Sequence, residues 1–140
     1  MATPVYGKQF IRFAETALVP ANLPLEAFTL VEIAGAVTEP PTIGVAQGAG
    51  CFGVLQQDMP AVDPERAVTL PRQATVATSG LLLVRADAGS LPAQGGGLEV
   101  NGSGEAAATG LAAITVNGTQ PTVRQLVQIG GIAHALVSFA

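Results

Sequence analysis

Charged side chains are scarce in this sequence. Six of its 140 residues are Lys or Arg and ten are Asp or Glu, so 11% of the chain is charged, against about 25% in an ordinary soluble domain. Trp is absent, and the only aromatic residues are five Phe and one Tyr. A chain that is 49% hydrophobic cannot cover its surface with so few ionic groups. We therefore expect another molecule to cover part of that surface.

Two kinds of partner are excluded by what the sequence lacks. The net charge is −4 and the pI is near 4.7, whereas binding to a phosphate backbone needs clustered Lys or Arg. We expect no nucleic-acid partner. A membrane-spanning helix needs about 20 apolar residues in a row, and the longest apolar runs, such as Leu81–Val84, have the length of a strand. We expect no membrane partner either, and we interpret the N-terminus as mature structure.

The residues that carry most enzyme chemistry are also few. Cys51 is the only cysteine and His134 the only histidine, so an intrachain disulfide, a thiolate metal site and a histidine-rich metal cluster are excluded. A nucleophile–histidine pair would need Cys51 or one of four serines with His134, and no nucleophile motif surrounds any of them. We expect no enzymatic activity, no catalytic residue, no metal and no cofactor.

The residues that are present favour strands. Val, Ile and Thr are abundant, Glu and Lys are few, and Gly and Pro occur in short clusters throughout, as turns between short strands require. The Asn-Gly pairs at 101–102 and 117–118 predict hairpins, and Gln47–Gly50 is a third candidate. A short helical turn over Glu105–Ala108 is possible. The predicted strands are Ala27–Val37, Ile43–Ala46, Cys51–Leu55, Arg66–Leu70, Gln73–Thr78, Leu81–Ala86, Gly97–Val100, Ala112–Val116, Thr122–Ile129 and Ile132–Phe139.

This pattern predicts an all-β, single-domain jelly roll or related Greek-key barrel or sandwich over residues 26–140. Residues 1–25 differ, because three prolines force extended backbone before them. We predict that they form an extended N-terminal arm, and that deleting residues 1–15 leaves a folded domain. Half of the chain's aromatic residues lie in this arm. The candidate partner-binding residues are Tyr6, Phe10, Ile11 and Phe13, and the alternative is that they pack on the domain's own core.

Three segments carry a resemblance to a known family. They are Ile43–Ala46, Leu81–Arg85, and the stretch from Gly89 through Gly95-Gly96-Gly97, Leu98 and Asn101-Gly102 to Ala106. Together they resemble the small decoration, or cement, proteins of tailed double-stranded-DNA bacteriophage heads. The resemblance implies a virion protein that is assembled in the host cytoplasm, binds the outer surface of the capsid and clamps neighbouring major capsid subunits against DNA pressure.

The partners that this resemblance implies are the major capsid protein and further copies of the chain in a homodimer or homotrimer. Two alternatives remain open. One is another structural virion protein, such as a head–tail joining or tail-tube subunit. The other is a small bacterial hydrolase or carbohydrate-binding module, which a concave pocket that joins His134 to a carboxylate would favour.

Overall fold

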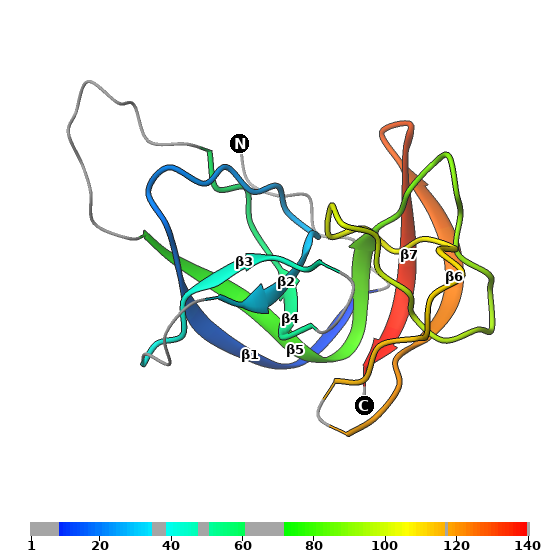
Figure 1. Ribbon diagram of the computed structural model, residues 1–140, viewed down its shortest axis with the longest axis horizontal. Helices are drawn as coiled ribbons and strands as arrows, with labels where there is room; N and C mark the ends of the chain where they lie inside the picture. Colours follow the sequence, from blue (N-terminus) through cyan, green and yellow to red (C-terminus); the bar gives the residue numbers. More distant parts are fainter. Residues whose placement is uncertain (1–8, 35–38, 48–50, 61–71, 117, 140) are drawn as a thin grey trace.

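A computed structural model describes residues 9–34, 39–47, 51–60, 72–116 and 118–139 (Figure 1). Within these ranges every regular element is a strand, which confirms the all-β prediction. The seven strands are β1 (Phe10–Val19), β2 (Leu30–Ile33), β3 (Ile43–Val45), β4 (Gly53–Leu55), β5 (Arg72–Arg85), β6 (Thr122–Ile129) and β7 (Ile132–Phe139). All of them belong to one antiparallel sheet.

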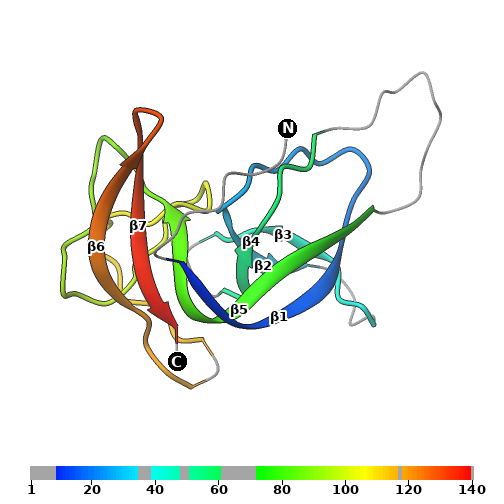
Figure 2. The same cartoon turned by 180° about the vertical axis from the view of Figure 1, so that it is seen from behind.

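Strand β5 organises this sheet. Along one edge it pairs with β1, from Phe10 opposite Leu81 to Val19 opposite Arg72. Along the other edge it pairs first with β4, near Ala77, and then with β7, from Gly80 to Arg85. The long green strand therefore runs through both halves of the molecule, as Figures 1 and 2 show from opposite sides.

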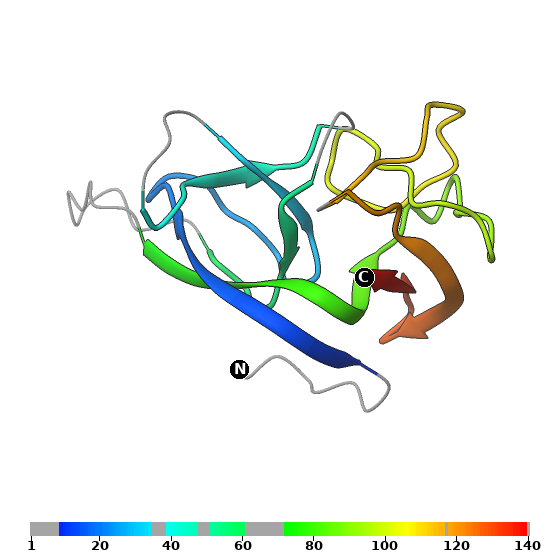
Figure 3. The same cartoon turned by 90° about the horizontal axis from the view of Figure 1, so that it is seen from below.

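Five of the strands close on themselves. The pairings run from β1 through β5, β4 and β2 to β3, and a parallel bridge from Thr42 to Leu18 brings the end of β1 beside the start of β3. The view from below shows these strands curled around a common interior, with the β6–β7 hairpin to one side (Figure 3). The fold is thus a small, closed barrel whose sheet is extended by a hairpin.

Two hydrophobic clusters share the strands β2, β4 and β5. One cluster contains Leu30, Val54 and Ala77, and the other contains their neighbours Val31, Leu55 and Val76. Successive side chains of a strand point to opposite faces, so the middle of the sheet is buried on both sides. The first cluster also takes in β7 and residues of the 98–116 segment, and the second fills the barrel with Val19, Ile43 and Met59.

Several sequence predictions match these elements. Strands β6 and β7 have the predicted bounds, and Gly130 and Gly131 between them both have positive φ, as a tight hairpin turn requires. The predicted 117–118 hairpin is present as a bridge between Val116 and Thr119. At 101–102 the chain also turns back, through a bridge from Val100 to Ala106. There the residue with positive φ is Gly104.

Other strand predictions were wrong. The hairpin at Gln47–Gly50 is not formed, because β3 and β4 each pair with β2, which lies between them. Gln73–Thr78 and Leu81–Ala86 are one strand, since β5 continues through Gly80. Gly97–Val100 and Ala112–Val116 make only isolated bridges, and Glu105–Ala108 makes no helical turn. The predicted strand Arg66–Leu70 lies outside the described residues.

Residues 10–19, predicted to belong to the arm, form β1 and pair along β5. Residues 1–8 lie outside the described part of the chain. Deleting residues 1–15 would therefore remove six residues of a paired strand as well as the segment before it. Point substitutions on β1 test its surface more cleanly than that deletion does.

Gly53 allows β4 to pack against β5. A Cβ at this position would collide with the carbonyl oxygen of Ala77 and lie 2.7 Å from Cγ1 of Val76. Gly44 in β3 has room, because the nearest atom to its Cβ position is 3.5 Å away. We expect Gly53→Ala to lower the free energy of unfolding by about 1–3 kcal/mol, while Gly44→Ala changes it by less than about 0.5 kcal/mol. Urea denaturation of both variants tests this, and equal effects would contradict the close approach of β4 to β5 at Gly53.

Candidate interaction surface

The first half of β1 presents an exposed apolar surface. Phe10 and Phe13 have 65% and 64% of their surface exposed, and Ile11 has 41%. Further along the same strand, Ala17 and Val19 are fully buried. Thus three of the four predicted partner-binding residues lie together on one strand and face solvent, while Tyr6 lies outside the described residues.

The same half of β1 has an open edge. Among the described residues, β1 meets a second neighbour only at Leu18, whose amide donates to the carbonyl of Pro41 over 2.8 Å. The carbonyl of Phe10 and the amide of Arg12 lie against Gly80 of β5. Because backbone groups alternate along a strand, the amide and carbonyl of Ile11 point to the open edge. An extended segment could pair there, as in strand addition.

A cleft of about 530 Å³ lies at the end of this open edge. Glu15 and Thr16 of β1 form one wall, and Glu39, Pro40 and Pro41, which lead to the Thr42 bridge, form another. Ile33 and Phe52 complete the lining. The cleft therefore combines apolar surface with two carboxylates at the point where β1 and β3 separate.

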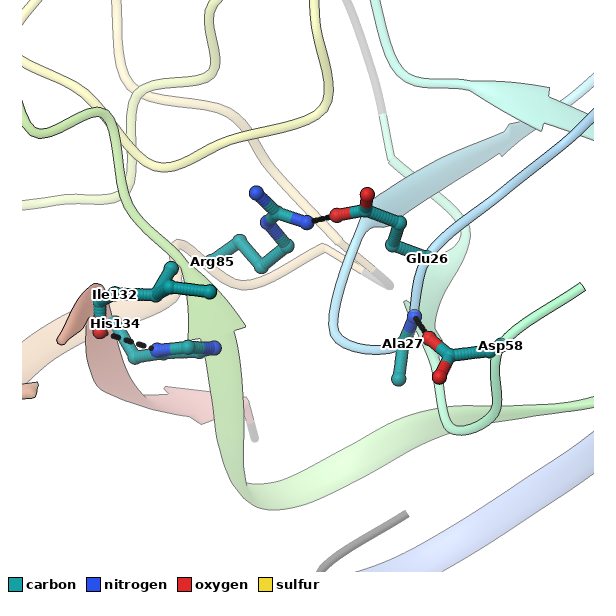
Figure 4. A network of polar contacts seen from close by, with 6 residues as sticks. All are labelled: Glu26, Ala27, Asp58, Arg85, Ile132 and His134. Atoms are coloured by element: carbon teal, nitrogen blue, oxygen red, sulfur yellow. Dashed lines mark hydrogen bonds and ion pairs between the residues drawn. The ribbon is translucent and has the colours of Figure 1, made fainter. Parts of the chain in front are cut away.

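A larger cavity of about 980 Å³ lies on another part of the molecule. Figure 4 shows the polar contacts beside it. Arg85, at the end of β5, forms an ion pair with Glu26, and the backbone amide of Ala27 donates to Oδ1 of Asp58 over 2.9 Å. Glu105 and His134 also line this cavity. The fold thus gathers the only histidine and three carboxylates around one hollow, which the sequence pattern did not predict.

His134 is held in its place by its own strand. Its Nδ1 lies 2.9 Å from the carbonyl oxygen of Ile132, which accepts a hydrogen bond from the Nδ1–H of the neutral ring. The ring of Phe28 meets the imidazole edge-on, with centroids 5.8 Å apart. Phe28 itself has a φ of 70°, a conformation that L-residues rarely adopt. Within the described residues, no hydrogen bond joins His134 to a carboxylate, and the backbone carbonyl of Ile132 is the group that orients the ring.

Cys51 is poorly suited to act as a nucleophile. Burial raises the pKa of its thiol to about 12, and its Sγ lies 3.4 Å from the carbonyl oxygen of Gly53. The thiolate, which is the reactive form, is therefore rare near neutral pH. Cys51 packs against the larger hydrophobic cluster.

Over the described ranges, no three His, Cys, Asp or Glu side chains come together as a metal site would require. The same part of the chain contains no helix long and apolar enough to cross a membrane.

No protein family matches this chain, and no curated protein is similar to it.

The environment of His134 makes folding stability depend on pH. Burial lowers its pKa below 6.5, and the nearby Arg85 lowers it further. The unfolded chain therefore binds a proton first as the pH falls, and the free energy of unfolding should decrease below about pH 6.5. The slope from this one group cannot exceed about 1.4 kcal/mol per pH unit. His134→Gln should remove this component.

Urea denaturation of wild-type protein and His134→Gln at about pH 7.5 and pH 5.5 measures the effect. Carboxylates titrate equally in both proteins, so the difference between the two slopes isolates His134. Identical slopes would show that the folded protein accepts the charged imidazole without cost.

Proposed function

We propose that this chain is a structural virion protein that binds the outer surface of a phage head and clamps neighbouring major capsid subunits. The observation that supports a binding role is the exposed apolar surface of Phe10, Ile11 and Phe13 on an open strand edge. Aromatic residues grouped on an accessible edge are the usual anchors of a protein interface. The resemblance to cement proteins suggests the capsid as the partner, and a jelly-roll or related Greek-key topology of the barrel belongs to the same proposal.

The mechanism that we propose is differential affinity. A clamp stabilises a shell when it binds the assembled lattice more tightly than the separated subunits. β1 suits this task because it is anchored along β5 and, within the part of the chain that the structure describes, its first half has no neighbour on the other edge. Its exposed side chains can therefore bind a neighbour without refolding of the barrel. The scarcity of charge fits a surface that is completed by docking.

The proposal extends to the oligomer. An open edge on an apolar strand can also pair with a second copy of the chain, which would give the homodimer or homotrimer expected from the sequence. Ring assembly in the absence of capsid would favour the alternative role as a head–tail joining or tail-tube subunit.

The 980 Å³ cavity favours a second candidate, a small hydrolase or carbohydrate-binding module, because it gathers His134 with Glu26, Asp58 and Glu105. Against it stand the contacts of these groups. Glu26 forms an ion pair with Arg85. Asp58 accepts a hydrogen bond from the backbone amide of Ala27, and Glu105 accepts one from Nδ2 of Asn101. Their roles in these contacts are structural, and we favour the interaction surface for this reason.

The decisive substitution is Phe10→Ser combined with Phe13→Ser. Both side chains are mostly exposed, so the barrel should remain folded, whereas binding to shells of the major capsid protein should weaken by about a hundredfold or more. The matched control is Leu91→Ser with Leu111→Ser, two apolar residues that are 46% and 64% exposed outside β1. Its binding should equal that of the wild type.

Co-sedimentation with purified shells, followed by electron microscopy of the decorated particles, measures both variants. Wild-type protein that does not bind the shells would contradict the virion role. Equal binding by the β1 variant and the control would place the contact elsewhere on the molecule.

A further inference from the structure

The carboxylates of the described residues fall into two groups. Six of them accept a hydrogen bond or form an ion pair: Glu26, Glu32, Asp58, Asp87, Glu99 and Glu105. The other two, Glu15 and Glu39, have no such partner among the described residues, and both line the 530 Å³ cleft beside the open edge of β1. Within the described ranges, the carboxylates that lack such a partner therefore lie together in one cleft.

The surroundings of these two carboxylates specify a particular kind of ligand. Ile11 turns its backbone groups to the open edge, and Phe10 and Phe13 are exposed on the same strand. A segment that pairs with β1 would run toward Pro41, where the residues just before β3 become the neighbour of β1. Its side chains near Glu15 would then enter the cleft, where Ile33 and Phe52 offer apolar surface to an aliphatic stem.

We propose that the open edge of β1 binds an extended protein segment that carries a lysine or arginine, and that its cationic group lies in the cleft with Glu15 and Glu39. The proposal rests on the proposed function insofar as it takes the partner to be a protein, and it adds the chemistry of the segment that is recognised. Backbone pairing along β1 provides general affinity, and the charge in the cleft selects the segment.

The chain itself is a poor source of such segments, because only six of its residues are basic. Only one of these, Arg12, lies on β1, beside the register shifts in the pairing of β1 with β5. A different protein is therefore the better occupant, and charge complementarity with the acidic cleft gives the basis for selecting it.

A display experiment tests this inference without using the capsid. A library of random peptides of about ten residues, the length of a long strand, is displayed on yeast and sorted for binding to the labelled full-length protein at about 50 mM NaCl, where charge interactions are weakly screened. We expect the selected peptides to carry Lys or Arg next to β-branched or aromatic residues. Their dissociation constants are then measured with variants of the protein.

The variant Glu15→Gln/Glu39→Gln should bind the selected peptides about tenfold more weakly at 50 mM NaCl, and the difference should shrink at about 500 mM. The matched control is Glu99→Gln/Glu105→Gln, which changes the net charge equally and keeps an amide oxygen to accept the existing hydrogen bonds. It should bind like the wild type. Circular dichroism of each variant confirms that it is folded.

A second pair of variants tests the backbone component. Ile11→Pro removes the amide that faces the open edge, and proline is tolerated on edge strands. Peptide binding should be lost in Ile11→Pro and retained in Ile11→Val. Loss in the proline variant together with retained folding supports strand addition.

Three outcomes would overturn the inference: no peptide is enriched, the enriched peptides lack basic residues, or the Glu15/Glu39 variant retains full affinity. These outcomes are distinct from failure of the virion role. If the protein selects basic peptides but does not bind phage shells, the peptide site on β1 is supported and the capsid is excluded as its partner.

Discussion

The burial of β2, β4 and the middle of β5 on both faces is the constraint on which the rest of this structure depends. Leu30, Val54 and Ala77 belong to one hydrophobic cluster, and their sequence neighbours belong to the other. A strand that is buried on both sides cannot carry polar residues at alternate positions. This explains why the pairs Leu30-Val31, Val54-Leu55 and Val76-Ala77 are apolar at both positions.

The path of β5 through the sheet also determines where the open edge of β1 lies. β5 must continue past β4 to reach β7, and β1 follows it along the opposite edge. The barrel closes through Leu18 and Thr42 at one end of β1. The strand β3 is only three residues long and leads away from this point, so within the described structure the first half of β1 has no neighbour on that side. The interaction surface is a consequence of how the barrel closes.

The large cavity illustrates the difference between gathering residues and arranging them for chemistry. His134, Glu26, Asp58 and Glu105 line one hollow, yet each of them contacts a backbone group or a structural partner. The polar network ties the end of β5 to the segment before β2, and the buried imidazole packs on Phe28. By contrast, Glu15 and Glu39 make no such contacts within the described residues. Groups without internal partners are the better indicators of binding here.

Local sequence signals predicted some of these features and could not predict others. Strands β6 and β7 were predictable because strong strand formers flank a Gly-Gly turn, and the all-β class followed from composition. The prediction of a hairpin at Gln47–Gly50 was wrong because a glycine cluster indicates a turn but does not determine which strands pair on either side of it. Gly97–Val100 has strand-forming residues, but its hydrogen bonds go to loop residues such as Pro121 and Ile114.

For the site, the sequence alone identified Phe10, Ile11 and Phe13 as unusual, because aromatic residues are rare and half of them lie near the N-terminus. Their exposure, the open edge and the acidic cleft were decided by tertiary structure. Glu15 and Glu39 are 24 residues apart in the sequence, and only the closure of the barrel brings them to one cleft. Composition and local pattern determine what a strand can be, whereas long-range pairing determines which of its edges is left open.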